Sequence, residues 1–360
     1  MFKTIRWISI GVVVLVSAYF FCLADFSSLA YRSETFNSGP ERFIPLPILN
    51  KAEYAARLFA LAHVSTSTLA VSPETAWDST TTTAVTQRLW PAKTVYPNAG
   101  AILPFKRIVA YYGNYYSTKM GVLGEYPATQ MLAMLASTTA EWAAADPNTP
   151  VIPALEYIAV VAQGDPGPDH MYRLRMPDDQ IEKTIQLANQ IHGLVILDVQ
   201  VGLSDLQKEL PLLEPYLIMP QVELAIDPEF SMKYGNPPDS VIGTFDASDI
   251  NYAATYLAGI VDKYHLPPKV LIVDRFTEAM VTNYKNIRPL PEVEIVMNMD
   301  GWGSRRKKKG TYNAVIYPEP VQFTGIKLFY KNDLRPPSHG MLTPAEILKL
   351  TPAPIYIQYQ

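Results

Sequence analysis

The feature that most constrains the fold is an alternation, from Phe105 onward, of short β-rich runs with segments of helical apolar spacing. The β-rich runs are 107–113, 153–161, 193–202, 221–227, 240–247, 269–276, 292–300 and 325–333. Helical patterns occupy 128–145, 178–192 and 248–265. Strands that alternate with helices form parallel sheets, and eight strands is the count of a (β/α)8 barrel. We therefore predict an α/β fold, a TIM-like barrel over residues 105–360.

Two segments of the sequence do not fit a regular eight-stranded barrel. The link between the fourth and fifth runs, "PEFSMKYGNPPDS", has no helical pattern, so the barrel is expected to be reduced on that side. The C-terminal "APIYIQYQ" is a candidate extra strand. The alternative fold is an open doubly wound sheet, but no GxGxxG follows the first run, which argues against a nucleotide-binding version of it.

Residues 1–25 have the features of a signal anchor or a signal peptide. Lys3 and Arg6 precede an apolar run over 7–24, and positive charge before such a run keeps the N-terminus in the cytoplasm. The run approaches the roughly 20 residues that span a bilayer. Only a weak small-residue cleavage site follows, which favours an anchor, and the aromatic residues before Cys22 argue against lipidation. We expect the rest of the chain to be extracytoplasmic, anchored to the membrane or secreted if the segment is cleaved.

Residues 26–104 are expected to form a stalk. The segment is rich in serine, threonine and proline, with "STST" at 65–68 and "STTTT" at 79–83. Such sequence buries too little apolar surface to offset its ordering entropy. The exception is 50–63, whose apolar spacing and leading asparagine predict a short helix.

Composition and motifs exclude several functions. A formal net charge of −4 gives no basic surface for nucleic acid. The single cysteine lies in the N-terminal apolar run, so cysteine catalysis and cysteine-bound zinc are excluded. The chain has no G-x-S-x-G, no Walker A loop and no H-E-x-x-H. No cofactor is predicted.

Acidic residues are concentrated at the ends of the predicted strands. They are Glu156, Asp198, Asp227, Glu229, Asp246, Asp274 and Asp300. Active sites of such barrels lie at the C-terminal ends of the strands, and a carboxylate in a buried strand costs several kcal/mol unless it is paired. The set therefore predicts a polar pocket. Asp246 and Asp274 have a simpler interpretation as caps of following helices, and Asp300 as a turn residue before "GWG".

Asp227 and Glu229, in "LAIDPEF", are the strongest catalytic candidates. Positions i and i+2 of a strand project to the same face, about 7 Å apart. Glycoside hydrolysis needs two carboxyl groups about 5–9.5 Å apart, one of them protonated. The D-x-E pattern on the fourth strand is similar to that of several glycoside hydrolase barrels, such as the lysozyme-like family that acts on peptidoglycan. The alternative is an acidic strand end that only caps a turn.

Aromatic residues follow several of the same strands. Tyr112, Trp302 and Tyr330 are predicted to stack on sugar rings, with Asp300 as a further substrate-binding residue; ordinary aromatic packing is the alternative. The basic run 305–309 follows the seventh strand. A solvated charge run is its default interpretation, and an anionic cell-surface polymer would be its natural partner.

Several blocks of the sequence resemble an uncharacterised family of exported bacterial proteins and lipoproteins. They include "LAIDPEF", "IGTFDASDIN", "LPPKVLIVDRFTEAMV", "NMDGWG", "GIKLFYKND" and "MLTPAEILKL". The resemblance covers about residues 107–360. It implies an exported TIM barrel that is glycosidase-like at the level of the fold, and it names no substrate.

The leading hypothesis is an extracytoplasmic, glycoside-hydrolase-like barrel that acts on a cell-envelope glycan. Glu229 is its general acid and Asp227 its companion carboxylate, while Asp198 and Glu156 position or tune them. Two alternatives remain open. One is a non-catalytic barrel that binds an envelope glycan; the other is a metal-dependent hydrolase in which Asp198, Asp227 and Asp300 hold magnesium or calcium.

Overall fold

The structure, a computed structural model, describes residues 46–65 and 88–360. The predicted anchor over 1–25, with Cys22, lies outside the described residues, as do the two low-complexity threonine-rich segments except Ser65. No helix in the described ranges is both long and apolar enough to cross a membrane.

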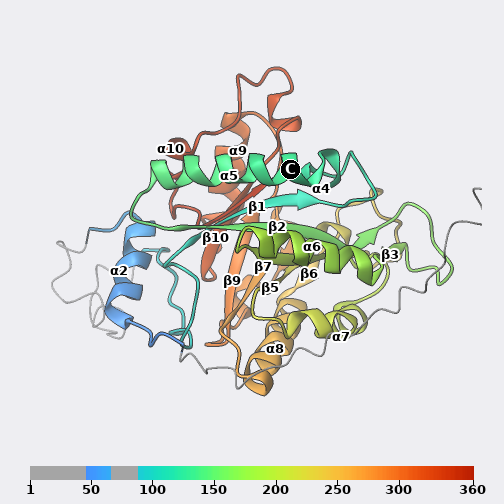
Figure 1. Ribbon diagram of the computed structural model, residues 1–360, viewed down its shortest axis with the longest axis horizontal. Helices are drawn as coiled ribbons and strands as arrows, with labels where there is room; N and C mark the ends of the chain where they lie inside the picture. Colours follow the sequence, from blue (N-terminus) through green and yellow to red (C-terminus); the bar gives the residue numbers. More distant parts are fainter. Residues whose placement is uncertain (1–45, 66–87) are drawn as a thin grey trace, which may run out of the picture. The chain divides into compact units, whose positions relative to one another are not determined.

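Eight parallel strands close into a barrel (Figure 1). In order around the barrel they are β1 (Arg107–Gly113), β2 (Val151–Ala162), β4 (Leu194–Val199), β5 (Val222–Ile226), β7 (Lys269–Arg275), β9 (Val293–Met299), β10 (Phe323–Leu328) and β11 (Tyr356–Tyr359). Strand β1 pairs with both β2 and β11 and so closes the circle. A short antiparallel strand, β3 (Arg173–Arg175), extends the end of β2. The predicted barrel is confirmed, and the open sheet is wrong.

The run 240–247 does not form the barrel strand that was predicted for it, and the barrel is not reduced beside it as expected. The run 240–247 yields only β6 (Phe245–Asp246), which pairs with β8 (Val281–Thr282) outside the barrel. Gly243 donates its N–H to the carbonyl of Glu229 (2.7 Å), so this segment folds over the end of β5 instead of joining the barrel. The eighth barrel strand is β11, from the C-terminal segment.

The connections change accordingly. Helix α8 (Ala247–Tyr264) joins β5 to β7, so the barrel is complete on the side where a reduction was expected. The connection without an α-helix is instead the one from β7 to β9, which holds β8 and two 3₁₀ turns, η3 (Glu278–Met280) and η4 (Tyr284–Asn286).

Helices cover the outside of the barrel. They are α4 (Val122–Glu125), α5 (Ala128–Ala145), α6 (Asp178–Gln190), α7 (Leu206–Leu217), α8, α9 (Arg305–Thr311) and α10 (Pro344–Ile347). Helices α5, α6 and α8 match the predicted helical patterns. Helix α7 was not predicted, because Pro211 and Pro215 interrupt its pattern. It forms because Asp205 caps it and a row of buried leucines packs on the barrel.

The N-terminal end of the barrel is closed by α2 (Lys51–Leu61). Asn50 caps this helix by accepting from the Glu53 N–H (3.1 Å), as the sequence indicated. Tyr54 and Leu58 pack with the inward-facing apolar residues of the strands. Described residues of the expected stalk, 46–65 and 88–104, therefore belong to the same compact unit as the barrel, which corrects the predicted boundary at 105 for these residues.

Candidate active site

The inside of the barrel changes from apolar to polar along the strands. Ile196 and Ile272 belong to the apolar cluster that faces α2. Because inward-facing positions alternate along a strand, Asp198 and Asp274, two residues later, also point inward. The buried polar layer at the C-terminal end of the strands comprises Tyr112, Glu156, Asp198, Asp227, Asp274, Asn298, Asp300, Lys327 and Gln358.

Glu156 lies at the bottom of this layer and is fully buried. Its Oε2 accepts hydrogen bonds from the Tyr356 hydroxyl and from Gln358 Nε2 (2.5 Å), while its Oε1 has no partner. Burial, with repulsion from Asp198, raises the pKa of Glu156 to about 8. Glu156 is thus protonated at neutral pH and does not line the pocket above it.

Asp198 acts on the pocket through Tyr112. The Tyr112 hydroxyl donates to Asp198 Oδ2 (3.1 Å) and accepts from Gln200 Nε2 (3.1 Å). Gln200 is fixed in turn by the N–H of Ala162, which donates to its Oε1 (3.0 Å). Tyr112 and Gln200 line the pocket and Asp198 lies behind them, where burial raises its pKa to about 7.

The two aspartates first interpreted as helix caps have different positions. Asp246 caps α8: it accepts from the Ser248 N–H (3.0 Å), and Asp249 accepts from the Asp246 N–H (2.7 Å). Asp274 caps nothing, because no α-helix follows β7. It is fully buried in the polar layer, where Asn298 Nδ2 donates to its Oδ1 (2.8 Å). The capping interpretation is confirmed for Asp246 and wrong for Asp274.

Lys327, on β10, is the one cation in the polar layer and is not among the predicted site residues. Its Nζ lies 3.2 Å from Asp300 Oδ1 and 3.8 Å from the centre of the Tyr112 ring. Burial alone lowers the pKa of a lysine, but the carboxylates of Asp300 and Asp274 outweigh it, so the pKa of Lys327 is raised and its charge is held. A lysine inside the apolar run "GIKLFY" was the sequence signal for it.

Asp227 and Glu229 share a turn rather than a strand. Strand β5 ends at Ile226, and residues 228–230 form the 3₁₀ turn η2 (Pro228–Phe230). Asp227 Oδ1 accepts from the Glu229 N–H (2.9 Å) and so caps this turn. Alternation along a strand therefore does not explain why these two side chains lie near each other. Asp227 also caps a turn, as the alternative interpretation expected. Both side chains nevertheless line one pocket.

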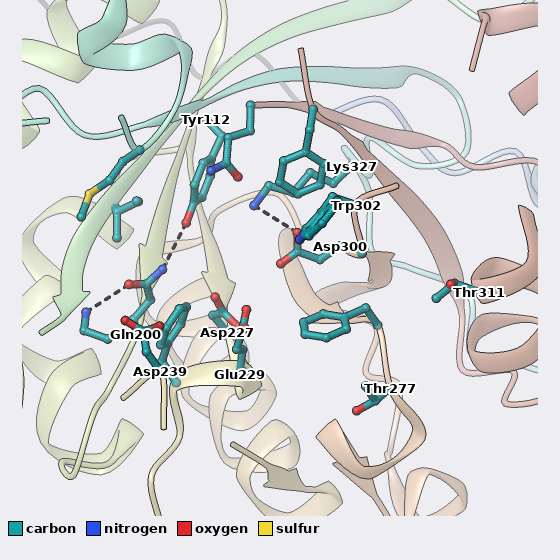
Figure 2. Close-up of a pocket in the computed structure, with 18 of the residues that line it drawn as sticks. Tyr112, Gln200, Asp227, Glu229, Asp239, Thr277, Asp300, Trp302, Thr311 and Lys327 are labelled. Carbon is teal, nitrogen blue, oxygen red and sulfur yellow. Dashed lines mark hydrogen bonds and ion pairs between the residues drawn. The ribbon is translucent and has the colours of Figure 1, made fainter. Parts of the chain in front are cut away.

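The pocket lies over the C-terminal ends of the strands and has a volume of about 680 Å³ (Figure 2). Its acidic lining is Asp227, Glu229, Asp239 and Asp300, its basic lining Lys119, Lys307 and Lys327, and its aromatic lining Tyr112, Phe230, Phe276, Trp302 and Phe329. Figure 2 marks the Tyr112–Gln200 hydrogen bond and the Lys327–Asp300 ion pair. A hollow of this size, with charged groups and several aromatic walls, suits a polar ligand such as a sugar.

The pKa values of Glu229 and Asp227 are both raised in this pocket. Burial, with repulsion from Asp300, raises the pKa of Glu229 to about 7. Burial, with repulsion from Asp274, raises the pKa of Asp227 well above its usual value. Because Lys327 is the only counter-charge in the layer, these acids cannot all be ionised together.

Three carboxyl groups approach one another closely enough to hold a cation. Ligand oxygens of Asp227, Asp274 and Asp300 all lie within 4.8 Å of one another, and these three side chains are buried. The sequence hypothesis placed Asp198 in this set; in the structure Asp274 takes that position. Oxygen ligands of this kind suit magnesium or calcium.

The basic run 305–309 is not simply a solvated charge run. It forms most of α9, which Ser304 caps. Lys308 is buried, pairs with Asp333 (3.2 Å) and donates to the carbonyl of Lys327 (2.6 Å). Lys307 remains exposed and lines the pocket beside Trp302.

Tyr330 differs in position from the other predicted substrate-binding residues. Tyr112, Asp300 and Trp302 line the pocket, and Tyr330 does not. The Tyr330 ring stacks on Tyr359 (5.3 Å between centres) and its hydroxyl bonds with that of Tyr111 (2.9 Å). Its contacts are those of ordinary aromatic packing.

Comparison with known proteins gives little further information. No protein-family model and no curated protein matches this chain. Among solved structures, it is similar to GH26C from Muricauda sp. MAR_2010_75, with 9% identity over 74% of this chain and 75% of that one and a TM-score of 0.28. At that TM-score the similarity supports no inference about function. The barrel is identified from its strand pairing, and the candidate site from the geometry of its residues.

Proposed function

We propose that this protein is a glycoside hydrolase that uses Glu229 as general acid and Asp227 as companion carboxylate. One observation carries the proposal: two carboxyl groups of one turn line the same pocket at the C-terminal end of the strands of a (β/α)8 barrel, both with raised pKa values, that of Glu229 to about 7. An acid with a pKa near the working pH is the group that general acid catalysis requires.

Each group has a role in this mechanism. Glu229 gives its proton to the oxygen of the scissile bond as that bond breaks. Asp227 stabilises the positive charge that develops on the sugar ring, or attacks it as nucleophile. Water then adds to the anomeric carbon, which releases the sugar, and the proton lost by that water restores the protonated general acid. For this role Asp227 must be ionised, so the retained proton of the cluster belongs on Asp274, which has no contact with solvent. Lys327 places its positive charge 3.2 Å from Asp300 Oδ1, at the edge of the carboxylate cluster.

The substrate and location belong to the proposal too. We propose a carbohydrate polymer of the cell envelope as substrate, with the barrel outside the cytoplasm and held to the membrane by residues 1–25. Lys3 and Arg6 before the apolar run support this orientation. Protease added to spheroplasts should release the barrel; its full protection there would contradict the location alone.

Turnover of purified envelope glycans tests the catalytic roles. Glu229→Gln keeps the size of the side chain and removes its transferable proton. We expect turnover to fall by roughly 10²–10⁴-fold while binding is retained. Asp227→Asn should do similar damage, and the double variant little more, because groups that act as a unit are not additive.

Glu278→Gln is the matched control, since Glu278 is exposed and lies outside the pocket. Turnover by Glu229→Gln equal to that of the control would reject the mechanism. Glycan binding without turnover by the wild type would instead identify a non-catalytic binding protein.

A metal-dependent hydrolase is the second candidate, favoured by the cluster of Asp227, Asp274 and Asp300. Against it, Lys327 already places a positive charge next to this cluster. Calorimetric titration of the chelator-treated protein with magnesium, calcium or manganese distinguishes the two. Binding that disappears in Asp274→Asn, with activity restored by the same ion, would support the metal and displace the first proposal.

A further inference from the structure

Cations near the pocket mouth fall into two groups. Those with carboxylate partners are Arg305 and Lys309, which pair with Glu346, Lys308, which pairs with Asp333, and Lys331, which pairs with Glu125. Lys307, Arg335 and Lys119 are exposed and form no ion pair within the described parts of the chain. The unpaired charges are thus free to meet an anion from outside.

Trp302 positions two of these unpaired cations. The Lys307 ammonium lies 4.8 Å from the centre of its ring, and the Arg335 guanidinium 5.5 Å. A cation over a tryptophan ring is attracted by the negative face of the ring. Trp302 is itself 45% exposed and lines the pocket with Lys307. The ring therefore positions Lys307, which lines the pocket with it, and Arg335, which lies against the ring without lining the pocket itself.

The pocket has an acidic and a basic side. The pocket acids that form no ion pair with any described residue, Asp227, Glu229 and Asp239, come from the segment after β5 (Figure 2). Lys307 follows β9 and Lys119 follows β1, and the charge of Asp300, which also follows β9, is matched by Lys327. The whole chain carries a net charge of −4, so an excess of cations does not explain their presence at this site. A ligand with its reacting bond at Glu229 and a negative group toward Trp302 would match both sides.

We propose that the pocket mouth binds an anionic substituent of the substrate, a carboxylate, phosphate or sulfate on a glycan. Lys307 and Arg335 are the anion ligands, Trp302 holds them in place, and Lys119 adds a further positive charge to the pocket lining. This rests on the proposed function and narrows its substrate class to acidic glycans. Guanidinium and ammonium groups recognise all three anions by charge-assisted hydrogen bonds.

The test measures binding to Glu229→Gln, so that turnover does not consume the ligand. The probes are immobilised glycans with carboxylate, phosphate or sulfate groups, and for each carboxylated glycan its methyl ester as matched neutral partner. Hydrogen bonds to charged groups are stronger than those between neutral groups, so at least one acidic glycan should bind roughly tenfold or more tightly than its neutral partner.

Two sets of substitutions locate the effect. Adding Lys307→Gln and Arg335→Gln together should remove most of the preference for the acidic glycan, and Trp302→Leu should weaken it. Arg306→Gln is the matched control, because Arg306 lies on the same helix, is exposed and does not line the pocket. It should leave the preference unchanged.

Binding of neutral glycans only, no binding to any acidic member, or an equal loss in Arg306→Gln would overturn the anion site. Turnover by the wild type separates this result from the proposed function. Cleavage of a neutral glycan that needs Glu229 would keep the hydrolase and reject the anion site. Binding of an acidic glycan through Lys307 and Arg335 without cleavage would keep the anion site and reject the hydrolase.

Discussion

Lys327 controls the protonation of the acids around it. Its positive charge lowers the pKa values of Glu156, Asp198, Glu229 and Asp274 relative to what burial alone would give. It also pairs with Asp300 and lies over the Tyr112 ring. One side chain therefore opposes the effect of burial on the ionisation of several acids at once.

Replacing Lys327 with methionine should shift the pH dependence of activity. A general acid works only while protonated, so activity falls as pH rises through the pKa of Glu229, which is about 7. Without the lysine that pKa rises, and the basic limb of the profile should move to higher pH while kcat/KM falls. Lys327→Arg keeps the charge and should restore the position of the limb. A profile with an unmoved limb in Lys327→Met would contradict this role.

Single residues show which parts of the site the sequence could reveal. The acids at strand ends stood out because carboxylates are rare in apolar runs, and that argument found Asp198, Asp227 and Asp300. It failed for Asp274, because a helix cap and a buried acid look alike in the sequence until the next element is known. It overlooked Lys327, although a lysine within "GIKLFY" is as anomalous as an aspartate.

At the scale of elements, α8 is tied to the helix-free side of the barrel by its cap. Besides capping the helix, Asp246 accepts hydrogen bonds from Thr282 (2.8 Å) and Asn283. These donors come from β8 and the residue after it, in the connection between β7 and β9 that has no α-helix. The hydrogen bonds hold the pKa of Asp246 below its usual value.

Asp246→Ala should destabilise the protein by about 1–2 kcal/mol, the usual cost of losing an N-cap. Because the folded pKa of Asp246 is depressed, its contribution is present above the unfolded value of about 3.9 and is lost as pH falls below it. Urea unfolding at pH 7 and at acid pH measures both effects. Asp262→Ala, an exposed change in the same helix, should be nearly neutral. Equal stability of the two variants at pH 7 would contradict the capping role.

The strands show why the sequence predicted a barrel but assigned one of its eight strands to the wrong segment. Seven of the predicted runs form barrel strands, since buried parallel strands are near-continuous apolar runs. The run 240–247 has a similar composition, but its backbone hydrogen-bonds to η2 and the residue after it instead of to a barrel strand. The C-terminal segment became β11 because β1 and β10 leave two free edges for it, which is a long-range fact that no local pattern contains.

At the scale of the whole molecule, the barrel keeps acids inside at a cost in stability. The pKa of Glu156 is raised to about 8, and that of Glu223 to about 7, in both cases chiefly by burial. A raised folded pKa means that the stability present below the unfolded value of about 4.3 is lost as pH rises toward the folded value. The free energy of unfolding should therefore decline between about pH 5 and pH 8.

Glu156→Gln should flatten part of that decline. The amide oxygen can still accept from Tyr356 and Gln358, and an amide has no charge to bury. The variant should be more stable than the wild type at pH 8, by about 1–3 kcal/mol, and similar to it at pH 5. Urea unfolding at both pH values is the measurement. Parallel stability curves would show that Glu156 titrates alike in the folded and unfolded states.

The account as a whole depends on the protonation of Glu229. Carbon-13 NMR of the protein labelled at glutamate side-chain carboxyl groups, titrated from pH 4 to pH 9 and compared with Glu229→Gln, observes it directly. The resonance that is missing in the variant should titrate at about pH 7 in the wild type. A missing resonance that titrates near the ordinary glutamate value of about 4.3 would leave Glu229 ionised at neutral pH and would contradict its role as general acid.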